Sequence, residues 1–275
     1  MKVGFIGTGS MGSILIESLI QSGALQPEHM IASNRTFSKV ELLEAKYPGF
    51  QAVQSNVQVA GDSDILFLCV KPKEFRQVAE EIKGAVCAEQ IVVSITSPVQ
   101  IKQLESVLKG KIAKIIPSIT NYVCSGATLC IYGDRITPED QILLERLLSN
   151  ISLPIRVAEE YTRVSSDLSS CGPAFLAFFV QKFVDAAVEQ TGIPREEAVR
   201  LAAEMVLGTG KLLTVGGFSP ESLQKRVSVP GGITEEALHL LDVRLQGVFN
   251  ELIETTHSKF FEDVDKVEAQ FYAPK

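Results

Sequence analysis

The sequence predicts an α/β domain with a doubly wound, mostly parallel sheet, followed by an all-α domain. In the first half of the 275-residue chain, short runs of β-branched residues alternate with longer segments of helical periodicity, which is the pattern of βαβ units. Beyond Tyr161, strand-like runs almost disappear and the helical segments lengthen. We therefore place the domain boundary near residue 158, with the α/β domain over residues 1–158 and the helical domain over residues 159–275.

Short runs rich in β-branched residues predict the strands of the first domain. They are Val3–Ile6, Met30–Ser33, Ile65–Val70, Ile91–Ile95, Ile112–Ile116 and Thr128–Ile131. Because Ile65–Val70 is apolar at every position, we expect a central parallel strand that is buried on both faces. Ser13–Ser22 and Val99–Leu108 show helical spacing between strands, and a last β-rich run, Leu153–Val157, closes the domain.

Helical periodicity dominates the second domain. The predicted helices are Phe175–Gln190, Glu196–Leu207, Glu221–Arg226 and Glu235–Glu254, separated by breaks that contain glycine and proline, as expected at helix ends. The first of them carries apolar residues around most of its circumference. This distribution predicts a helix that is buried between its neighbours.

Composition and charge exclude several classes of protein. With 45% hydrophobic and 21% charged residues, the chain has enough apolar material for a folded core. A formal net charge of −7 disfavours nucleic acid and anionic membranes as partners. The longest apolar runs, Ile65–Val70 and Ala174–Val180, are shorter than the roughly 18 residues of a membrane span. The N-terminus lacks the regions of a signal peptide, so we expect a cytoplasmic protein.

The cysteines and histidines predict neither a disulfide framework nor a metal centre. The five cysteines are odd in number and show no Cys-x-x-Cys spacing, and the three histidines are scattered, whereas metal ligands recur at short fixed spacings. Cys171 is a candidate catalytic thiol. The alternative for Cys171 is a small packed residue or a passive pocket wall.

A glycine-rich turn follows the first predicted strand and opens a predicted helix. Its residues are Gly7, Thr8, Gly9, Ser10, Met11 and Gly12, which match the Gly-x-Gly-x-x-Gly pattern of dinucleotide-binding loops. Gly7 permits the tight turn, Gly9 lets the backbone approach a pyrophosphate, and Gly12 allows close helix–strand packing. The helix N-terminus then offers free N–H groups to the phosphates. The alternative is a plain glycine-rich turn.

The end of the second strand indicates which dinucleotide binds. NAD-preferring sites place an acid there for the ribose hydroxyls, but this strand ends in Ser33-Asn34-Arg35-Thr36. Arg35 is suited to a bidentate contact with a 2′-phosphate, and Asn34 and Thr36 can donate hydrogen bonds beside it. NADP(H) is therefore favoured and NAD(H) stays possible. The alternative for Arg35 is an ordinary solvated charge.

Val70, Lys71 and Pro72 follow the strand that begins at Ile65. Ligands of open α/β sheets bind at the carboxyl ends of the strands. We therefore expect Pro72 to fix the turn and Lys71 to reach a phosphate or ribose, with a surface lysine as the alternative.

Two predicted helix starts in the second domain are suited to an anion. Pro230-Gly231-Gly232-Ile233-Thr234 precedes one helix, and its successive backbone N–H groups can converge as a nest. Thr234 either contacts the ligand or caps the helix. Ser169 to Ala174 opens the other, with Pro173 suited to the first helical position. A small carboxylate fits such helix ends.

Motifs along the whole chain resemble those of the pyrroline-5-carboxylate reductases. They are Val3-Gly-Phe-Ile-Gly-Thr-Gly-Ser-Met-Gly12, Ser33-Asn-Arg-Thr36, Val70-Lys-Pro72, Cys171-Gly-Pro-Ala-Phe175, Asp185-Ala-Ala-Val188 and Pro230-Gly-Gly-Ile-Thr234. The resemblance implies a Rossmann domain that binds NAD(P)H, a helical domain that forms a homodimer or a higher oligomer, and an active site between them. It also implies hydride transfer to the C=N carbon of pyrroline-5-carboxylate, which gives L-proline.

The resemblance also implies roles for individual residues. It assigns the Gly231 and Gly232 amides and Thr234 to the substrate, and Asn56 to the cofactor. From the residues themselves, Thr234 and Cys171 are the candidates for catalysis, and Gly172 is a further candidate for the substrate. A protonated imine already carries the charge that attracts hydride, so the protein must mainly orient the two reactants. No metal is expected.

The chain departs from the family pattern where substrate is expected. The family's Pro-Asn-Thr-Pro is Pro117-Ser-Ile-Thr120 here, its Ser-Gly-Ser-Gly-Pro-Ala-Tyr is Ser169-Ser-Cys-Gly-Pro-Ala-Phe175, and its Thr-Ser-Pro-Gly-Gly-Thr-Thr is Ser228-Val-Pro-Gly-Gly-Ile-Thr234. This profile resembles the divergent members found in bacterial late-competence operons. Three functions stay open: reduction of pyrroline-5-carboxylate or a near relative, NADP(H)-dependent regulation without turnover, and reduction of another small carboxylate.

Overall fold

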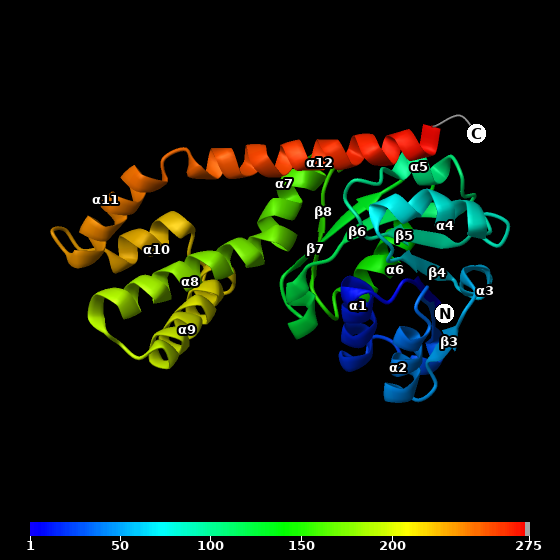
Figure 1. The fold of residues 1–275 in the computed structure, drawn as a ribbon, viewed down its shortest axis with the longest axis horizontal. Coiled ribbons are helices and arrows are strands. Elements are labelled where there is room, and N and C mark those ends of the chain that lie inside the picture. Colours follow the sequence, from blue (N-terminus) through cyan, green and yellow to red (C-terminus); the bar gives the residue numbers. More distant parts are fainter. Residues whose placement is uncertain (273–275) are drawn as a thin grey trace. The chain divides into compact units, whose positions relative to one another are not determined.

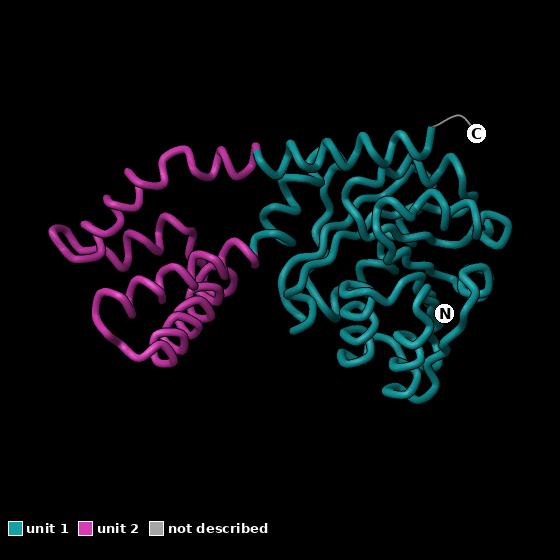
Figure 2. Tube along the Cα trace, viewed as in Figure 1, with its two compact units in different colours: residues 1–172, 255–275 teal, residues 173–254 magenta. Residues whose placement is uncertain are grey.

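The computed structural model describes residues 1–272, and the chain divides into two compact units (Figure 2). The first unit is Met1–Gly172 together with the chain from Thr255 onward, and the second is Pro173–Glu254. The units therefore divide at residue 172 rather than near residue 158. The reason is that residues 159–172 contact the sheet, and the C-terminal helix returns to pack on it through Val267 and Phe271.

The first unit is built on an eight-stranded sheet with the strand order β3-β2-β1-β4-β5-β6-β7-β8. The strands are β1 (Val3–Ile6), β2 (Met30–Ser33), β3 (Gln51–Val53), β4 (Ile65–Leu68), β5 (Ile91–Ser94), β6 (Lys111–Ile116), β7 (Ala127–Tyr132) and β8 (Leu153–Arg156). Neighbouring strands are parallel except for β6 and β7, which pair antiparallel. The predicted doubly wound, mostly parallel sheet is confirmed.

Helices cover both faces of the sheet (Figure 1). One hydrophobic core joins the sheet to α1 (Ser10–Gln21), α2 (Ser38–Lys46) and α6 (Pro138–Leu148). The other joins it to α3 (Asn56–Gly61), α4 (Phe75–Ile82), α5 (Ile101–Glu105) and the C-terminal part of α12 (Val248–Tyr272). Short turns complete the unit: η1 (Pro27–His29), η2 (Pro72–Glu74), η3 (Ile119–Val123), η4 (Glu159–Tyr161), α7 (Thr162–Ser166) and the π-helical η5 (Asp167–Cys171).

The apolar runs of the sequence explain the centre of the sheet. Every residue of β1, β2, β4 and β5 is buried, because helices cover both faces. The predicted strand Ile65–Val70 ends earlier, at Leu68. β3 was not predicted, since its three residues are partly exposed at the sheet edge and give no apolar run.

The second unit is helical, as predicted. It contains α8 (Gly172–Thr191), α9 (Arg195–Thr214), α10 (Pro220–Val227), α11 (Ile233–Leu245) and the first residues of α12. The predicted single helix Glu235–Glu254 is wrong, because α11 ends before Gly247, whose φ of +80° no helix accommodates.

The prediction of a buried helix at Phe175–Gln190 is also wrong for the single chain. Only Val184 of α8 is buried, while Phe178 and Phe183 are 55% and 67% exposed. Periodicity reports how apolar a helix is, but not whether the surface that covers it belongs to the same chain.

Candidate dinucleotide-binding site

The glycine loop after β1 is shaped by close backbone approaches. Gly7 has a φ of +101°, and a Cβ there would lie 2.6 Å from the carbonyl oxygen of Cys69. A Cβ at Gly12 would lie 2.3 Å from the carbonyl oxygen of Gly7. Only glycine fits these two positions. Gly9 differs, because a Cβ there would have no atom within 4 Å, which leaves its backbone open to a ligand.

The N-terminus of α1 fits a phosphate. Gly9 is the N-cap, no side chain caps the helix, and its first turn contains no acid. The N–H groups of the first turn have no partner within a helix, so they can donate to an anion. Thr8 is only 3% exposed, and its Oγ1 is buried without a hydrogen-bond partner. An orphaned hydroxyl beside an uncapped helix end is what a bound phosphate would satisfy.

Three loops meet at the carboxyl edge of the sheet. Ile6, at the end of β1, pairs with Ser33 of β2 on one side and Leu68 of β4 on the other. The strands therefore end at one level and carry the glycine loop, Asn34–Thr36 and Val70–Pro72 in adjacent positions. The chain adds β2 and β3 on one side of β1 and then adds β4 and β5 on the other side. The gap between the loops after β1 and β4 is therefore the switch point, where doubly wound sheets bind dinucleotides.

Asn56 is drawn to the end of β2, although it lies 23 residues further along the chain. The Ser33 hydroxyl donates to Oδ1 of Asn56 at 2.7 Å, and Nδ2 of Asn56 donates to Oε2 of Glu81 at 2.9 Å. Asn34 donates from Nδ2 to the carbonyl oxygen of Thr36 at 3.1 Å. The predicted polar residues Asn34 and Asn56 thus lie together at the carboxyl end of β2.

Glu74 enters the same region and was not predicted from the sequence. Its Oε1 lies 2.9 Å from Nη1 of Arg35, and its Oε2 accepts the backbone N–H of Lys71 at 3.4 Å. Arg35 is 86% exposed at its side chain and Glu74 is 24% exposed. The only sequence signal was an acid three residues after the N-cap of a Pro-initiated turn.

Cys171 belongs to a polar network of the first unit. Its Sγ accepts a hydrogen bond from Nη2 of Arg163 at 3.2 Å, and the same nitrogen donates to Oδ1 of Asp167 at 2.7 Å. The buried Asp167 carboxylate also accepts from the Thr256 hydroxyl at 2.8 Å, and His257 Nε2 lies 3.7 Å from it. The network links α7 and η5 to α12, which supports a packed structural role for this thiol.

The loop after β6 is held by Asn121 and by two serines, Ser118 and Ser170, that depart from the motifs of the resemblance. The backbone N–H of Ser118 donates to Oδ1 of the buried Asn121 at 2.8 Å, and its hydroxyl donates to the carbonyl oxygen of Ser169 at 3.0 Å. Ser170 donates to the carbonyl oxygen of Pro117 at 3.0 Å. These hydroxyls fix the loop against η5, and sequence analysis had not assigned Asn121 any role.

Gly231, Gly232 and Thr234 lie in the second unit at the start of α11. The N-cap is Gly232, without a side-chain hydrogen bond, so the capping interpretation of Thr234 is wrong. Gly231 has a φ of +71°, and its N–H donates to Oε2 of Glu235 at 2.7 Å. A carboxylate of the chain itself is therefore bound at the predicted carboxylate site.

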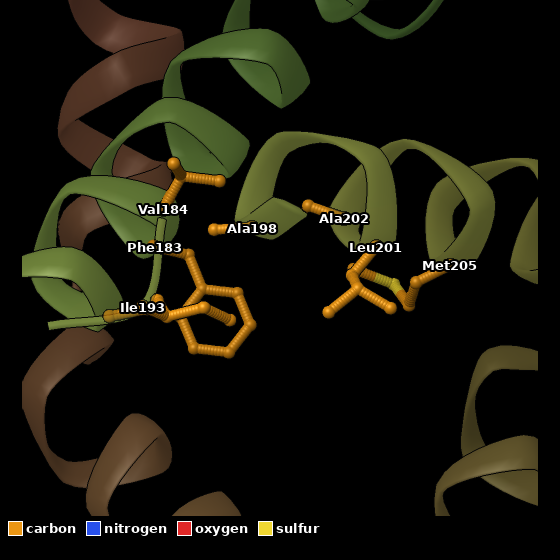
Figure 3. A pocket seen from close by; sticks show the side chains of 8 residues that line it. Phe183, Val184, Ile193, Ala198, Leu201, Ala202 and Met205 are labelled. Carbon is orange, nitrogen blue, oxygen red and sulfur yellow. The ribbon is translucent and has the colours of Figure 1, made fainter. Parts of the chain in front are cut away.

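The second unit also carries apolar grooves on α8 and α9 (Figure 3). One groove of about 260 Å³ is lined by Phe183, Val184, Ala187, Ile193, Ala198, Leu201, Ala202 and Met205. Another, of about 520 Å³, runs from Pro173 to Val206 along the same two helices. Surface of this kind marks an interaction site.

The thiols, acids and histidines of residues 1–272 form neither a disulfide nor a metal site. All five cysteines are free thiols, and burial raises the pKa of Cys130 to about 11. Among residues 1–272, no group of three or more His, Cys, Asp or Glu side chains is placed to hold a metal ion. Over the same residues, one helical run, 159–191, is long and apolar enough by composition to cross a membrane, and only 6% of its most apolar stretch is buried inside the single chain.

Two family models match the chain. One, described as pyrroline-5-carboxylate reductase dimerisation, covers residues 159–262, and one, described as NADP oxidoreductase coenzyme F420-dependent, covers residues 2–98. A pyrroline-5-carboxylate reductase of Methanosarcina acetivorans is 32% identical over 88% of this chain and 89% of its own length.

The chain belongs to the pyrroline-5-carboxylate reductase family. ComE operon protein 4 of Bacillus subtilis is 37% identical over 99% of this chain and 100% of its own length. A pyrroline-5-carboxylate reductase structure from Coxiella burnetii matches with a TM-score of 0.83 and 27% identity, covering 98% of both chains. One from Plasmodium falciparum, with NADP bound, has a TM-score of 0.81 and 22% identity over 98% of both chains and shows the same fold. The resemblance predicted from the motifs is confirmed.

Proposed function

We propose that this protein reduces pyrroline-5-carboxylate to L-proline with NADPH. The observation that carries the proposal is the combination of the open Gly9 loop and uncapped α1 with the match to pyrroline-5-carboxylate reductases along the chain. When bound, the reduced nicotinamide supplies the hydride that the C=N carbon accepts. The work of the protein is then to bind and orient both molecules.

Different residues of the first unit bind different parts of the cofactor. The backbone around Gly9 and the orphaned Thr8 hydroxyl receive the pyrophosphate. Arg35, with Asn34 and Thr36 beside it, receives the 2′-phosphate and favours NADP(H) over NAD(H), because a guanidinium binds a phosphate in a bidentate manner. Asn56 and Val70–Pro72 complete the nucleotide shell.

The substrate carboxylate is assigned to the start of α11. An uncapped helix N-terminus with a glycine in the left-handed region offers converging N–H groups to an anion. The Thr234 hydroxyl adds a donor or acceptor beside them, whereas Gly172 shapes the start of α8. The arrangement of Cys171 supports packing rather than attack on the substrate.

A homodimer is the proposed assembly, with a higher oligomer as an extension of it. The apolar grooves of α8 and α9 fall inside residues 159–262, which match the dimerisation model. Burial against a second copy explains why α8 is apolar and yet largely exposed in the single chain. Because a second copy covers this apolar surface, it is not available to a membrane, and we place the protein in the cytoplasm.

A second candidate is an NADP(H)-binding protein without turnover. It is favoured by the substituted motifs at Ser118, Cys171 and Val229, where the family has other side chains, while the glycine loop is intact. Initial rates of NADPH oxidation, measured at 340 nm with pyrroline-5-carboxylate and with a six-membered cyclic imino acid, separate the candidates. Turnover with the five-membered ring at about 1–1000 per second supports the reductase. Tight NADPH binding without consumption supports the second candidate.

A further inference from the structure

An acidic side chain stands beside the end of β2, although that strand itself ends without one. Arg35 follows β2, and Glu74 lies in η2 after β4. Because β1 lies between β2 and β4, the 2.9 Å ion pair of Arg35 with Glu74 spans the carboxyl end of β1. This is the crevice in which a doubly wound sheet binds a dinucleotide.

Glu74 is the better fixed member of this pair. Its second oxygen accepts the N–H of Lys71 and so caps η2, and its side chain is 24% exposed. Arg35 is 86% exposed. A 2′-phosphate that engages Arg35 must therefore share the guanidinium with a carboxylate that stays in place, and the two anions repel each other.

We propose that Glu74 sets the cofactor specificity of this chain. It competes with the 2′-phosphate of NADP(H) for Arg35, and it offers a ribose hydroxyl of NAD(H) the carboxylate that NAD-type sites use. The inference rests on the proposed function only in that the crevice must take a dinucleotide. Glu74 thus makes the site less selective for NADP(H) than a site with Arg35 alone.

The test compares equilibrium dissociation constants for NADPH and NADH, obtained by titration of nicotinamide fluorescence with the full chain. Glu74→Gln keeps an oxygen for the Lys71 N–H but removes the charge. We expect it to tighten NADPH binding and to weaken NADH binding, each by about 2- to 5-fold, the range that an exposed ion pair supports. Arg35→Gln should weaken NADPH binding by about 10-fold and affect NADPH more than NADH.

Glu89→Gln is the matched control. Glu89 is exposed and lies two residues before β5, at the amino ends of the parallel strands and so at the opposite end from the crevice. Its replacement removes the same charge without touching the site. A ratio of the two dissociation constants that moves in Glu74→Gln but not in Glu89→Gln supports the inference. An unchanged ratio in Glu74→Gln, or an equal change in both variants, overturns it.

The outcomes also separate this inference from the proposed reductase activity. If the ratio shifts as expected while no imino acid is consumed, Glu74 sets specificity and the reductase proposal fails. If the wild-type protein binds neither NADPH nor NADH, both are overturned. Titrations at two salt concentrations add a readout, because screening must reduce the Glu74→Gln effect if it is electrostatic.

Discussion

The backbone N–H of Gly231 donates a 2.7 Å hydrogen bond to a carboxylate oxygen of Glu235. Glu235 lies in the first turn of α11, so a carboxylate of the helix itself binds at the N-terminal end of that helix. This is a favourable position for a carboxylate because of the exposed N–H groups and the helix dipole. The same position is the one we assign to the carboxylate of the substrate, so the two carboxylates compete.

Replacing Glu235 should therefore improve substrate binding. In Glu235→Gln, we expect the KM for pyrroline-5-carboxylate to fall by about 2- to 5-fold, the scale of an exposed charge interaction, with kcat unchanged. L-proline is the product and is not consumed in the reductive direction, so its Kd can be measured directly and should fall in parallel. Glu236→Gln removes the same charge from the same helical turn and is the control. A KM that stays constant, or falls equally in both variants, would contradict the assignment of this site.

Thr234 should affect the substrate and not the fold. Because Gly232 and not Thr234 caps α11, Thr234→Ala is expected to leave the free energy of unfolding unchanged. Loss of a hydrogen bond to a charged ligand should lower kcat/KM by about 10-fold or more. Chemical denaturation and initial rates measure the two effects separately. A loss of stability that accounts for the loss of activity would contradict the assignment of Thr234 to the substrate site.

Gly7 and Gly9 of the loop should respond differently to alanine. Gly7→Ala places a Cβ 2.6 Å from a carbonyl oxygen at a φ of +101°, so we expect a loss of about 1–3 kcal/mol in unfolding free energy. Gly9→Ala has open space and a φ of −74°, so the fold should keep its stability. Its Cβ occupies the approach of the pyrophosphate, and the Kd of NADPH should rise at least tenfold. Equal effects of both variants on stability would contradict this division of roles.

Exposed apolar residues of α8 should control the assembly. Phe183 is 67% exposed in the single chain and lines the groove of Figure 3. Phe183→Glu places a charge in the proposed interface, where desolvation makes it costly, and sedimentation should show a shift from dimer to monomer. Ile142→Glu, at an exposed site on α6 of the first unit, should remain dimeric. A dimer that survives Phe183→Glu would place the interface elsewhere.

Lys114 should make the free energy of unfolding depend on pH in the alkaline range. Its side chain is 2% exposed, with Nζ 2.7 Å from Glu159, and burial lowers its pKa from 10.5 although Glu159 acts to raise it. Between the lowered pKa and 10.5, the unfolded chain binds more protons at this group, so its contribution to stability rises with pH. The Glu159 side chain is 40% exposed and stays solvated without its partner, so Lys114→Met removes a buried charge without leaving another one buried and should be more stable than the wild type at pH 7. Its advantage should shrink as pH approaches 10, and a difference independent of pH would contradict the assignment.

Local sequence was sufficient for the parts of the fold that depend on neighbouring residues. The apolar run of β4 and the glycines at 7, 9 and 12 predicted both the sheet and the loop after β1. The break at Gly247 was missed, because apolar residues continue at helical spacing on both sides of it. The packing of Phe271 on the sheet also could not be predicted, since it depends on a return of the chain over a long separation.

The candidate site shows the same limit. Arg35 was predicted from the end of one strand, but its partner Glu74 lies 39 residues away in the loop of another. Only the strand order brings these two loops together. Likewise, the link from Ser33 to Asn56 follows from the position of α3 and not from a motif.

The most direct test of the account is the stoichiometry of the reaction in one sample. Purified wild-type protein is incubated with NADPH and pyrroline-5-carboxylate, and the NADPH consumed is compared with the L-proline formed. The account predicts one molecule of proline for each NADPH oxidised, and no oxidation without the imino acid. NADPH that binds but is not consumed, with no proline formed, would contradict it.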